Sequence, residues 1–189
     1  LNNPETALEV LLNYQKNGGV LSYDQKLHLA KLANSVGRDD IALLQWETLW
    51  RQATLPARKH FLEGLLVKAI LKQGSADSQI KHLELALSNG SIMQHELDLL
   101  VALYLAKQNL SNAEVAIDQY AKRFILPEKQ RLELLASLFG RSRTYSKLNE
   151  VWRQLAKVDP TNAQQYWQQI TLNSLRNNAF DNMEELGGV

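Results

Sequence analysis

Four histidines are the residues of this chain with the side chain best suited to bind a transition metal. They are His28, His60, His82 and His95. A zinc-binding helix carries two ligands one turn apart, as in the HExxH motif; no two of these histidines stand at that spacing and the motif is absent. The chain also contains no cysteine, which excludes disulfides, thiolate metal ligands and thiol nucleophiles. The sequence therefore predicts solvated helical histidines and no metal site.

Other residue patterns that could carry catalysis are equally scarce. Gly18-Gly19 and Gly37 are isolated helix breaks rather than a glycine-rich phosphate loop, and no GxSxG nucleophile motif occurs. The acid pairs Asp39-Asp40 and Glu184-Glu185 fall at expected helix starts, where carboxylates complement the helix dipole. We therefore expect neither an enzymatic activity nor a cofactor in this chain.

Composition limits the class of protein. The chain has 189 residues, 45% of them hydrophobic, with only 9 Gly and 4 Pro, which is typical of packed helices. The formal net charge of +1 lacks the basic excess of a general nucleic-acid binder, so no nucleic-acid partner is expected.

No segment has the length and apolar character of a membrane span. The strongest apolar run, Leu97 to Ala106, is interrupted by Asp98 and is too short to cross a bilayer. The chain opens with Leu1 in a polar turn, without the basic and apolar regions of a signal peptide. We read it as a piece of a longer protein.

Helical signals follow one another along the whole chain. Asn3-Pro4-Glu5 combines a cap, a first-turn proline and an early acid, and Ser22 with Gln25 forms a capping box. No segment alternates with period two, so no strand is expected. The predicted helices run from Pro4 to Gly18, Ser22 to Gly37, Asp39 through Trp50 and Pro56 to Gln73, and then over 76–88, 93–108, 111–125, 128–141, 144–157, 162–177 and 180–186.

A repeat organises these helices. Every second helix contains an early position followed four residues later by a large apolar residue, and successive copies lie 34 to 37 residues apart. The copies are Ala7-x3-Leu11, Ala42-x3-Trp46, Gln79-x3-Leu83, Ala113-x3-Ile117, Leu148-x3-Trp152 and the decayed Met183-x3-Gly187. We interpret Trp46, Trp50 and Trp152 as core residues between crossing helices.

The repeat resembles that of the tetratricopeptide repeat family, W-x2-L-G-x2-Y … A-x3-F … P. The copy nearest to it reads Leu132-x2-Leu135-Ala136-x2-Phe139, then Leu148-x3-Trp152 and Asp159-Pro160. The resemblance implies an all-α fold, a right-handed superhelical α-solenoid of antiparallel helix pairs that forms one repeat domain over 1–189. Its divisions are a half repeat over 1–19, full repeats over about 22–56, 57–91, 92–126 and 127–161, and a partial repeat over 162–189.

In such a solenoid the first helix of each pair lines a concave groove, so helical spacing predicts which side chains face a ligand. They mix leucines with spaced polar groups and a basic fringe, which suits a peptide with apolar anchors and some acidic character. The predicted groove residues are Lys31, Asn34, Leu65, Lys68, Lys72, Asp98, Leu99, Leu105, Glu133, Arg141, Gln169, Leu172 and Arg176.

The sequence thus predicts a non-catalytic scaffold that binds a protein or peptide partner in the groove. Two alternatives stay open. The chain could be a structural spacer or self-association segment of a larger bacterial envelope or export protein, for example one exporting exopolysaccharide, which would favour the cell envelope over the cytoplasm. It could also be an accessory domain of an enzyme whose catalytic part lies elsewhere.

Overall fold

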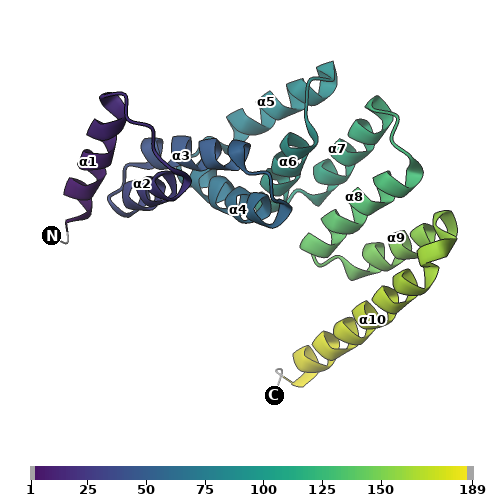
Figure 1. Ribbon diagram of the computed structural model, residues 1–189. Coiled ribbons are helices and arrows are strands. Elements are labelled where there is room, and N and C mark those ends of the chain that lie inside the picture. Colours follow the sequence, from purple (N-terminus) through teal and green to yellow (C-terminus); the bar gives the residue numbers. More distant parts are fainter. Residues whose placement is uncertain (1–2, 187–189) are drawn as a thin grey trace. The chain divides into compact units, whose positions relative to one another are not determined.

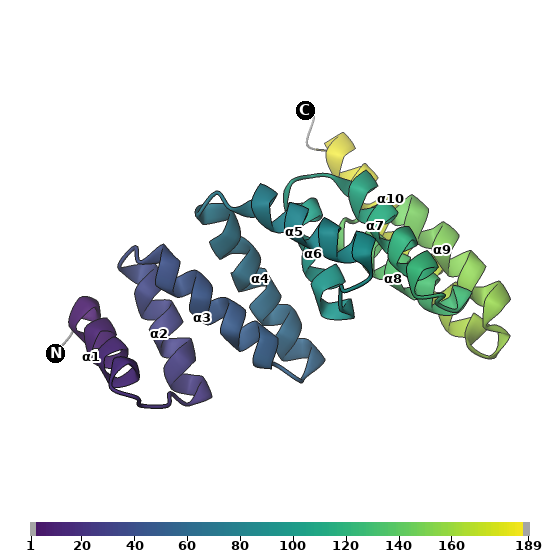
Figure 2. The same ribbon diagram turned by 90° about the horizontal axis from the view of Figure 1, so that it is seen from above.

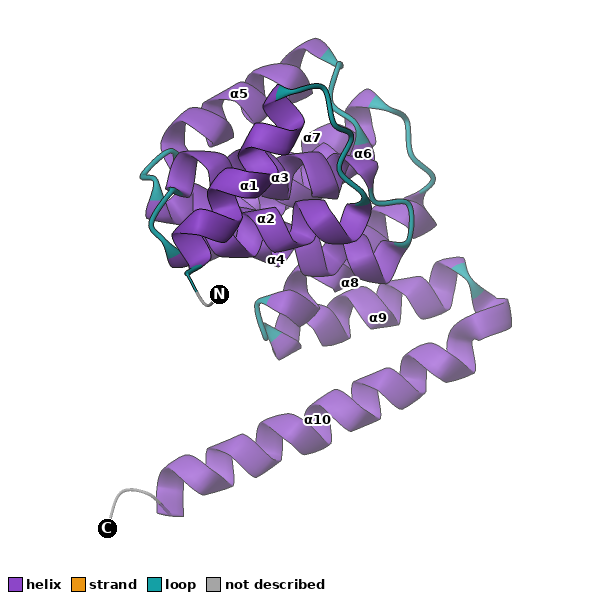
Figure 3. Ribbon diagram, turned by 60° about the vertical axis from the view of Figure 1, so that its left-hand side comes forward, coloured by secondary structure: helices purple, strands orange, loops and turns teal. Residues whose placement is uncertain are grey.

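The protein is helical throughout the described part of the chain. The computed structural model describes the backbone of residues 3–186 and the side chains of residues 3–176, and within these residues it contains ten α-helices, one 3₁₀ turn and no strand (Figure 3). Successive helices pack against each other, as in an α-solenoid, which confirms the all-α fold class. Within the same described residues, no helix combines the length and apolar character needed to cross a bilayer.

The chain divides into two compact units, and the division lies within one helix. Of the described residues, 3–82 form the first unit and 83–186 the second, so helix α5 begins in one and ends in the other. No change of composition marks this division in the sequence, and the sequence predicts a single repeat domain. The boundaries of the individual repeats stay a prediction.

In the first unit the helices follow one another side by side (Figures 1 and 2). Short turns between them make each helix antiparallel to the next, so α2 and α4 run in the same direction with α3 between them. The helices are α1 (Pro4–Lys16), α2 (Tyr23–Ser35), α3 (Asp39–Gln52), α4 (Pro56–Lys72) and the start of α5 (Ala76–Asn89).

The second unit continues the same arrangement from the end of α5. Each of its later helices packs against the next one along the chain (Figure 1). They are α6 (Gln94–Ala106), α7 (Leu110–Arg123), α8 (Glu128–Arg141), α9 (Tyr145–Val158), the 3₁₀ turn η1 (Pro160–Asn162) and α10 (Ala163–Leu186).

The helix starts form where the sequence predicts them. The Asn3 side chain accepts a hydrogen bond from the Glu5 backbone N–H, and Pro4 occupies the first turn. Ser22 and Gln25 form the predicted capping box: the Ser22 hydroxyl accepts from the Gln25 N–H, and the Gln25 side chain accepts from the Ser22 N–H. Each such contact satisfies a backbone donor that the helix itself leaves open.

The prediction of separate helices over 162–177 and 180–186 is wrong, because α10 runs without interruption from Ala163 to Leu186. The sequence between the two predicted helices contains no Gly or Pro, and asparagine lowers helix propensity only slightly. The decayed copy Met183-x3-Gly187 therefore begins inside α10, and Gly187 lies outside the described residues.

Six of the repeat positions are buried, Ala42, Trp46, Leu83, Ala113, Ile117 and Leu148, whereas Ala7, Leu11, Gln79 and Trp152 are half-buried. Ala42 and Ala113 are 1% and 0% exposed, and the large residues that follow them, Trp46 and Ile117, are buried as well. Small residues at these positions let two helices approach closely while the large residue fills the space beside them.

The three tryptophans that we interpreted as core residues differ in burial. Trp46 and Trp50 are buried, whereas Trp152 is half-buried and stacks on Tyr166 of α10 with ring centroids 5.5 Å apart. Trp167, the large residue that opens the last predicted repeat, is exposed rather than packed in the core.

Seven helices end in the same turn, in which one residue adopts a left-handed backbone with positive φ. The residue after it donates its N–H to the carbonyl five positions earlier, at 2.8 to 3.1 Å, which closes the helix as a Schellman motif. The left-handed residues are Gly18, Gly37, Gly74, Gly90, Gln108, Ile125 and Arg143.

A polar cluster around Asp159 joins the last helices of the second unit. The Asp159 carboxylate accepts hydrogen bonds from Asn162 at 2.9 Å and Tyr166 at 2.8 Å, and pairs with Lys129 Nζ at 2.7 Å. These contacts, the Lys129 hydrogen bond foremost, lower the pKa of Asp159 from 3.8 to about 2. The cluster ties the start of α8 to the junction between α9 and α10.

Candidate functional site

Two neighbouring stripes of side chains on α2 and α4 form the strongest candidate site of the first unit. On α2 the stripe repeats about once per turn, and on α4 it follows the same helical spacing, so each stripe lies along one side of its helix. We call this surface the α2–α4 face; its residues are Tyr23, Leu27, Lys31 and Asn34 on α2, and Arg58, Phe61, Leu65 and Lys68 on α4.

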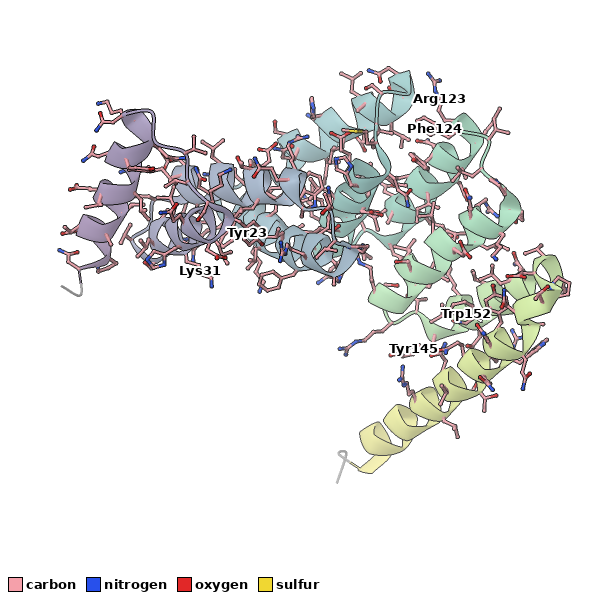
Figure 4. The ribbon with its side chains drawn as sticks, in the orientation of Figure 1. Tyr23, Lys31, Arg123, Phe124, Tyr145 and Trp152 are labelled. Atoms are coloured by element: carbon pink, nitrogen blue, oxygen red, sulfur yellow. The ribbon has the colours of Figure 1, made fainter. Side chains whose placement is uncertain are left out.

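A contact between Arg58 and Tyr23 sets the register of the two stripes. The Arg58 guanidinium carbon lies 4.6 Å from the centroid of the Tyr23 ring, within cation–π distance. Since α2 and α4 run in the same direction, this contact places the N-terminal ends of the stripes together. Figure 4 shows Tyr23 and Lys31 along α2.

The α2–α4 face is both apolar and basic. Phe61 is 58% exposed, Leu27 and Leu65 are half-buried, and Lys31 and Lys68 are exposed. Neither of these two lysines makes an ion pair with any described residue. Neither stripe contains a carboxylate, so the face presents aromatic and aliphatic groups among cations.

Gly64 lies beside this face, in the middle of α4. A Cβ atom built there would meet no other atom within 4 Å, so packing does not require a glycine. Glycine in a helix interior is destabilising by roughly 0.5–1 kcal/mol relative to alanine. Its absence of a side chain leaves the backbone open next to Phe61 and Lys68.

Two other predicted residues of this unit differ in their surroundings. Lys72 Nζ pairs with Asp39 Oδ1 at 2.6 Å and so links the end of α4 to the start of α3. Asn34 is exposed at the end of the α2 stripe. Lys72 is therefore occupied within the fold, whereas Lys31, Asn34, Leu65 and Lys68 lie on the α2–α4 face.

In the second unit a hollow of about 370 Å³ opens between the starts of α6 and α8 and the end of α7. Among the predicted residues it contains Glu133. The lining residues are Gln94, Tyr120, Leu126, Gln130, Glu133 and Leu134.

This hollow differs in charge from the α2–α4 face. Burial and, less strongly, the Asp98 carboxylate raise the pKa of Tyr120 above its usual value. Asp98 is half-buried and Glu133 is exposed. The hollow therefore offers amides and the Glu133 carboxylate, and nothing in its lining favours an acidic partner.

The prediction that Leu99 faces a ligand is wrong, because Leu99 is 5% exposed. Helix α6 buries residues on all its sides, as expected for a helix that is apolar all round, so helical spacing cannot identify a free face there. Leu105, on the same helix, is half-buried.

The remaining predicted residues lie apart from the hollow. Arg141 is exposed at the end of α8. On α10, Gln169, Leu172 and Arg176 are exposed, and Leu172 retains 47% of its surface.

The sequence patterns missed residues that the structure adds to both sites. The sequence indicates Tyr23 only as part of a helix start, although Tyr23 stands one turn before Leu27 and two turns before Lys31 and shares their side of α2. Arg58 and Phe61 carry the same helical signal on α4. In contrast, Gln94 and Tyr120 reach the hollow from different helices, and only their arrangement in space reveals this.

The histidines show no arrangement that would hold a metal. His28, His60 and His82 are exposed, and His60 Nδ1 lies 3.8 Å from the buried Glu63 carboxylate. Across the side chains that the structure describes, no three His, Asp or Glu groups gather in metal-binding geometry.

Comparison with known proteins adds no family. No protein-family model matches the chain, and no curated protein matches it. The resemblance to tetratricopeptide repeats thus rests on the residues quoted above.

Proposed function

We propose that this chain is a non-catalytic protein-interaction scaffold, of the kind tetratricopeptide repeats form, and that it binds an acidic peptide segment with apolar anchors on the α2–α4 face. The observation that supports this most directly is the composition of the face. Exposed Phe61 stands on it between cations, and neither stripe carries a carboxylate.

The contacts expected in the complex follow from these groups. Phe61 and Leu65 would bury apolar side chains of the peptide, and fully burying one such side chain contributes about 1.5–3 kcal/mol. Lys31 and Lys68 would pair with its carboxylates, at about 0.2–1 kcal/mol for each exposed pair.

Rigid support on helices favours binding. Arg58 already rests on the Tyr23 ring, so less side-chain entropy is lost when it meets a carboxylate. A helical scaffold of this kind presents its side chains without a folding step, as in other surfaces that bind peptides along a groove.

The hollow between α6 and α8 would bind a segment of a partner that differs in charge from the segment bound on the α2–α4 face. Its amides and the Glu133 carboxylate suit polar or basic groups rather than acidic ones. This proposal therefore places the acidic partner on the α2–α4 face and not in the hollow between α6 and α8.

A selection from a library of displayed random peptides tests the proposal. We expect wild-type protein to enrich peptides that combine aromatic or aliphatic residues with Asp and Glu. The variant Lys31→Glu/Lys68→Glu should bind the enriched peptides about tenfold or more weakly, since it removes two ion pairs and adds repulsion. Phe61→Ala should weaken them by loss of apolar contact.

The matched control is Lys16→Glu/Lys81→Glu, which makes the same charge change at two exposed lysines of the first unit outside the face. It should bind the peptides as wild type does. Failure to enrich any peptide, or equal loss in the control, would contradict the proposal and favour the spacer or accessory-domain alternatives.

A further inference from the structure

A second apolar surface lies in the second unit, where the ends of α5 and α7 meet the turns that follow them. It is a hollow of about 550 Å³, within the size range of small-ligand pockets, and we call it the α5–α7 hollow. Its lining residues are Leu87, Ser88, Gln119, Lys122, Arg123 and Ile125.

Ile125 is the unusual residue of this hollow. It occupies the left-handed position that closes α7, with φ 50°, while its side chain is 88% exposed. The equivalent positions of the other six helices that end this way hold Gly, Gln or Arg. A β-branched residue is the least suited to this backbone, so local stability does not explain its presence.

The surroundings of Ile125 continue the apolar surface. Leu87 of α5 is 4% exposed and forms the floor, and Phe124 keeps 40% of its surface. The Phe124 ring packs on Tyr120, with centroids 4.6 Å apart, which holds it in place. An exposed, strained aliphatic residue thus stands beside an anchored aromatic one.

Two cations form the rim. Lys122 and Arg123 are exposed, and neither makes an ion pair with any described residue. Arg123 extends from α7 to the turn after α5, where its Nε lies 2.7 Å from the position that a Cβ atom on Gly90 would occupy. Figure 4 shows Arg123 and Phe124 at this end of α7.

The charge of the hollow determines the partner that would complement it. Among the residues that the structure describes, no carboxylate lines it, and the two cations stand next to an apolar floor. Cations in the last turn of α7 also complement the dipole of that helix. That interaction does not explain why isoleucine occupies position 125. Strain retained at an exposed residue is typical of binding sites.

We propose that the α5–α7 hollow is a second docking site, which binds a short acidic segment of a partner protein. One aliphatic side chain of that segment inserts between Leu87 and Ile125, and flanking carboxylates pair with Lys122 and Arg123. The site is separate from the α2–α4 face and does not depend on it.

A panel of fluorescein-labelled peptides tests this site by fluorescence polarisation. Each peptide has one central Leu, Ile, Val, Met or Phe flanked by glutamates; control peptides carry serine at the centre or glutamine in the flanks. At least one aliphatic peptide should bind the wild type, and both controls should bind at least about tenfold more weakly. If no peptide binds, or the serine control binds equally well, the proposal is overturned.

Variants then locate the binding. Ile125→Gly should weaken the peptide about tenfold without loss of stability, because glycine suits the left-handed backbone. Lys122→Glu/Arg123→Glu should abolish binding, whereas Lys157→Glu, a single charge reversal in the last turn of α9, should leave it unaltered. Equal affinity of Ile125→Gly and wild type would place the site elsewhere.

Two further measurements distinguish this site from the α2–α4 face and from a self-association surface. The hollow variants are compared in the Lys31→Glu/Lys68→Glu background, which removes binding of acidic peptides at the α2–α4 face. The aliphatic peptide should still bind this background, so failure of the α2–α4 face leaves this result standing. In sedimentation velocity without peptide, the wild type and Ile125→Gly should show the same association state. If the wild type self-associates and Ile125→Gly does not, the occupant is a second copy of the chain and the acidic segment is refuted.

Discussion

Replacing Ile125 with glycine should make the protein more stable. An L-residue in the left-handed region costs about 1–2 kcal/mol, and a β-branched residue fits there least well. Glycine has no such cost, although its greater freedom in the unfolded chain returns part of the gain, about 0.5–1 kcal/mol. The backbone hydrogen bond from the Leu126 N–H to the Ala121 carbonyl, at 2.9 Å, does not involve the side chain and should persist.

The side chain that is removed contributes little packing. With 88% of its surface exposed, Ile125 buries only about an eighth of what full burial would provide. Full burial of isoleucine contributes about 1.5–3 kcal/mol, so the loss is at most about 0.4 kcal/mol. The net expectation for Ile125→Gly, taken from the middle of these ranges, is an increase of about 0.5 kcal/mol in the free energy of unfolding.

Urea unfolding followed by far-ultraviolet circular dichroism measures this change. The midpoint should move to higher urea with an unchanged slope, and the melting temperature should rise by about 1–2 °C. Ile125→Val keeps the branched side chain and should show no gain, while Ile125→Asn should show part of it because asparagine tolerates the left-handed region. A midpoint equal to or below that of the wild type would refute the reasoning about strain.

Three further predictions concern other parts of the fold. The pKa of Asp159 is lowered from 3.8 to about 2. The contribution of Asp159 to stability should therefore be complete above about pH 4 and disappear as the pH falls through 2. Asp159→Asn should flatten this part of a profile of melting temperature against pH. Gly64→Ala should raise the free energy of unfolding by roughly 0.5–1 kcal/mol in urea titrations and, if a peptide backbone lies close to α4, weaken the peptides selected on the α2–α4 face. Leu99→Ala should cost about 2–5 kcal/mol in the same titrations, whereas Leu172→Ala should change stability by less than about 0.5 kcal/mol; similar costs for the two would contradict their different burial.

Local signals in the sequence predict most of the fold. Caps and breaks act through residues a few positions apart, so the capping box of Ser22 and the stop at Gly37 identify helix ends without knowledge of the rest of the chain. The paired spacing of Ala42 with Trp46 likewise predicts burial, because residues one turn apart share one side of a helix. The predicted break before residue 180 failed because the intervening residues only weakly oppose a helix.

The candidate sites are less accessible to such reasoning. Leu99 was assigned to a groove by spacing, but spacing identifies a free side only when the helix has a polar side to compare with it. The contact of Arg58 with Tyr23 joins helices that are separated along the chain by α3, and no local pattern predicts it. The sequence also gives no indication that Ile125 adopts a left-handed backbone, since the residue type itself disfavours it.

The neighbour-to-neighbour packing of the helices bears on how the protein is made. The side-chain ties described above connect helices that are at most two apart along the chain, as Arg58 and Tyr23 connect α4 to α2. Contacts between residues close in sequence need little loop closure, and proteins rich in them fold rapidly. Each new helix can therefore dock on the one before it while the ribosome is still adding residues, so the growing chain need not wait for its last segment to begin burying its leucines.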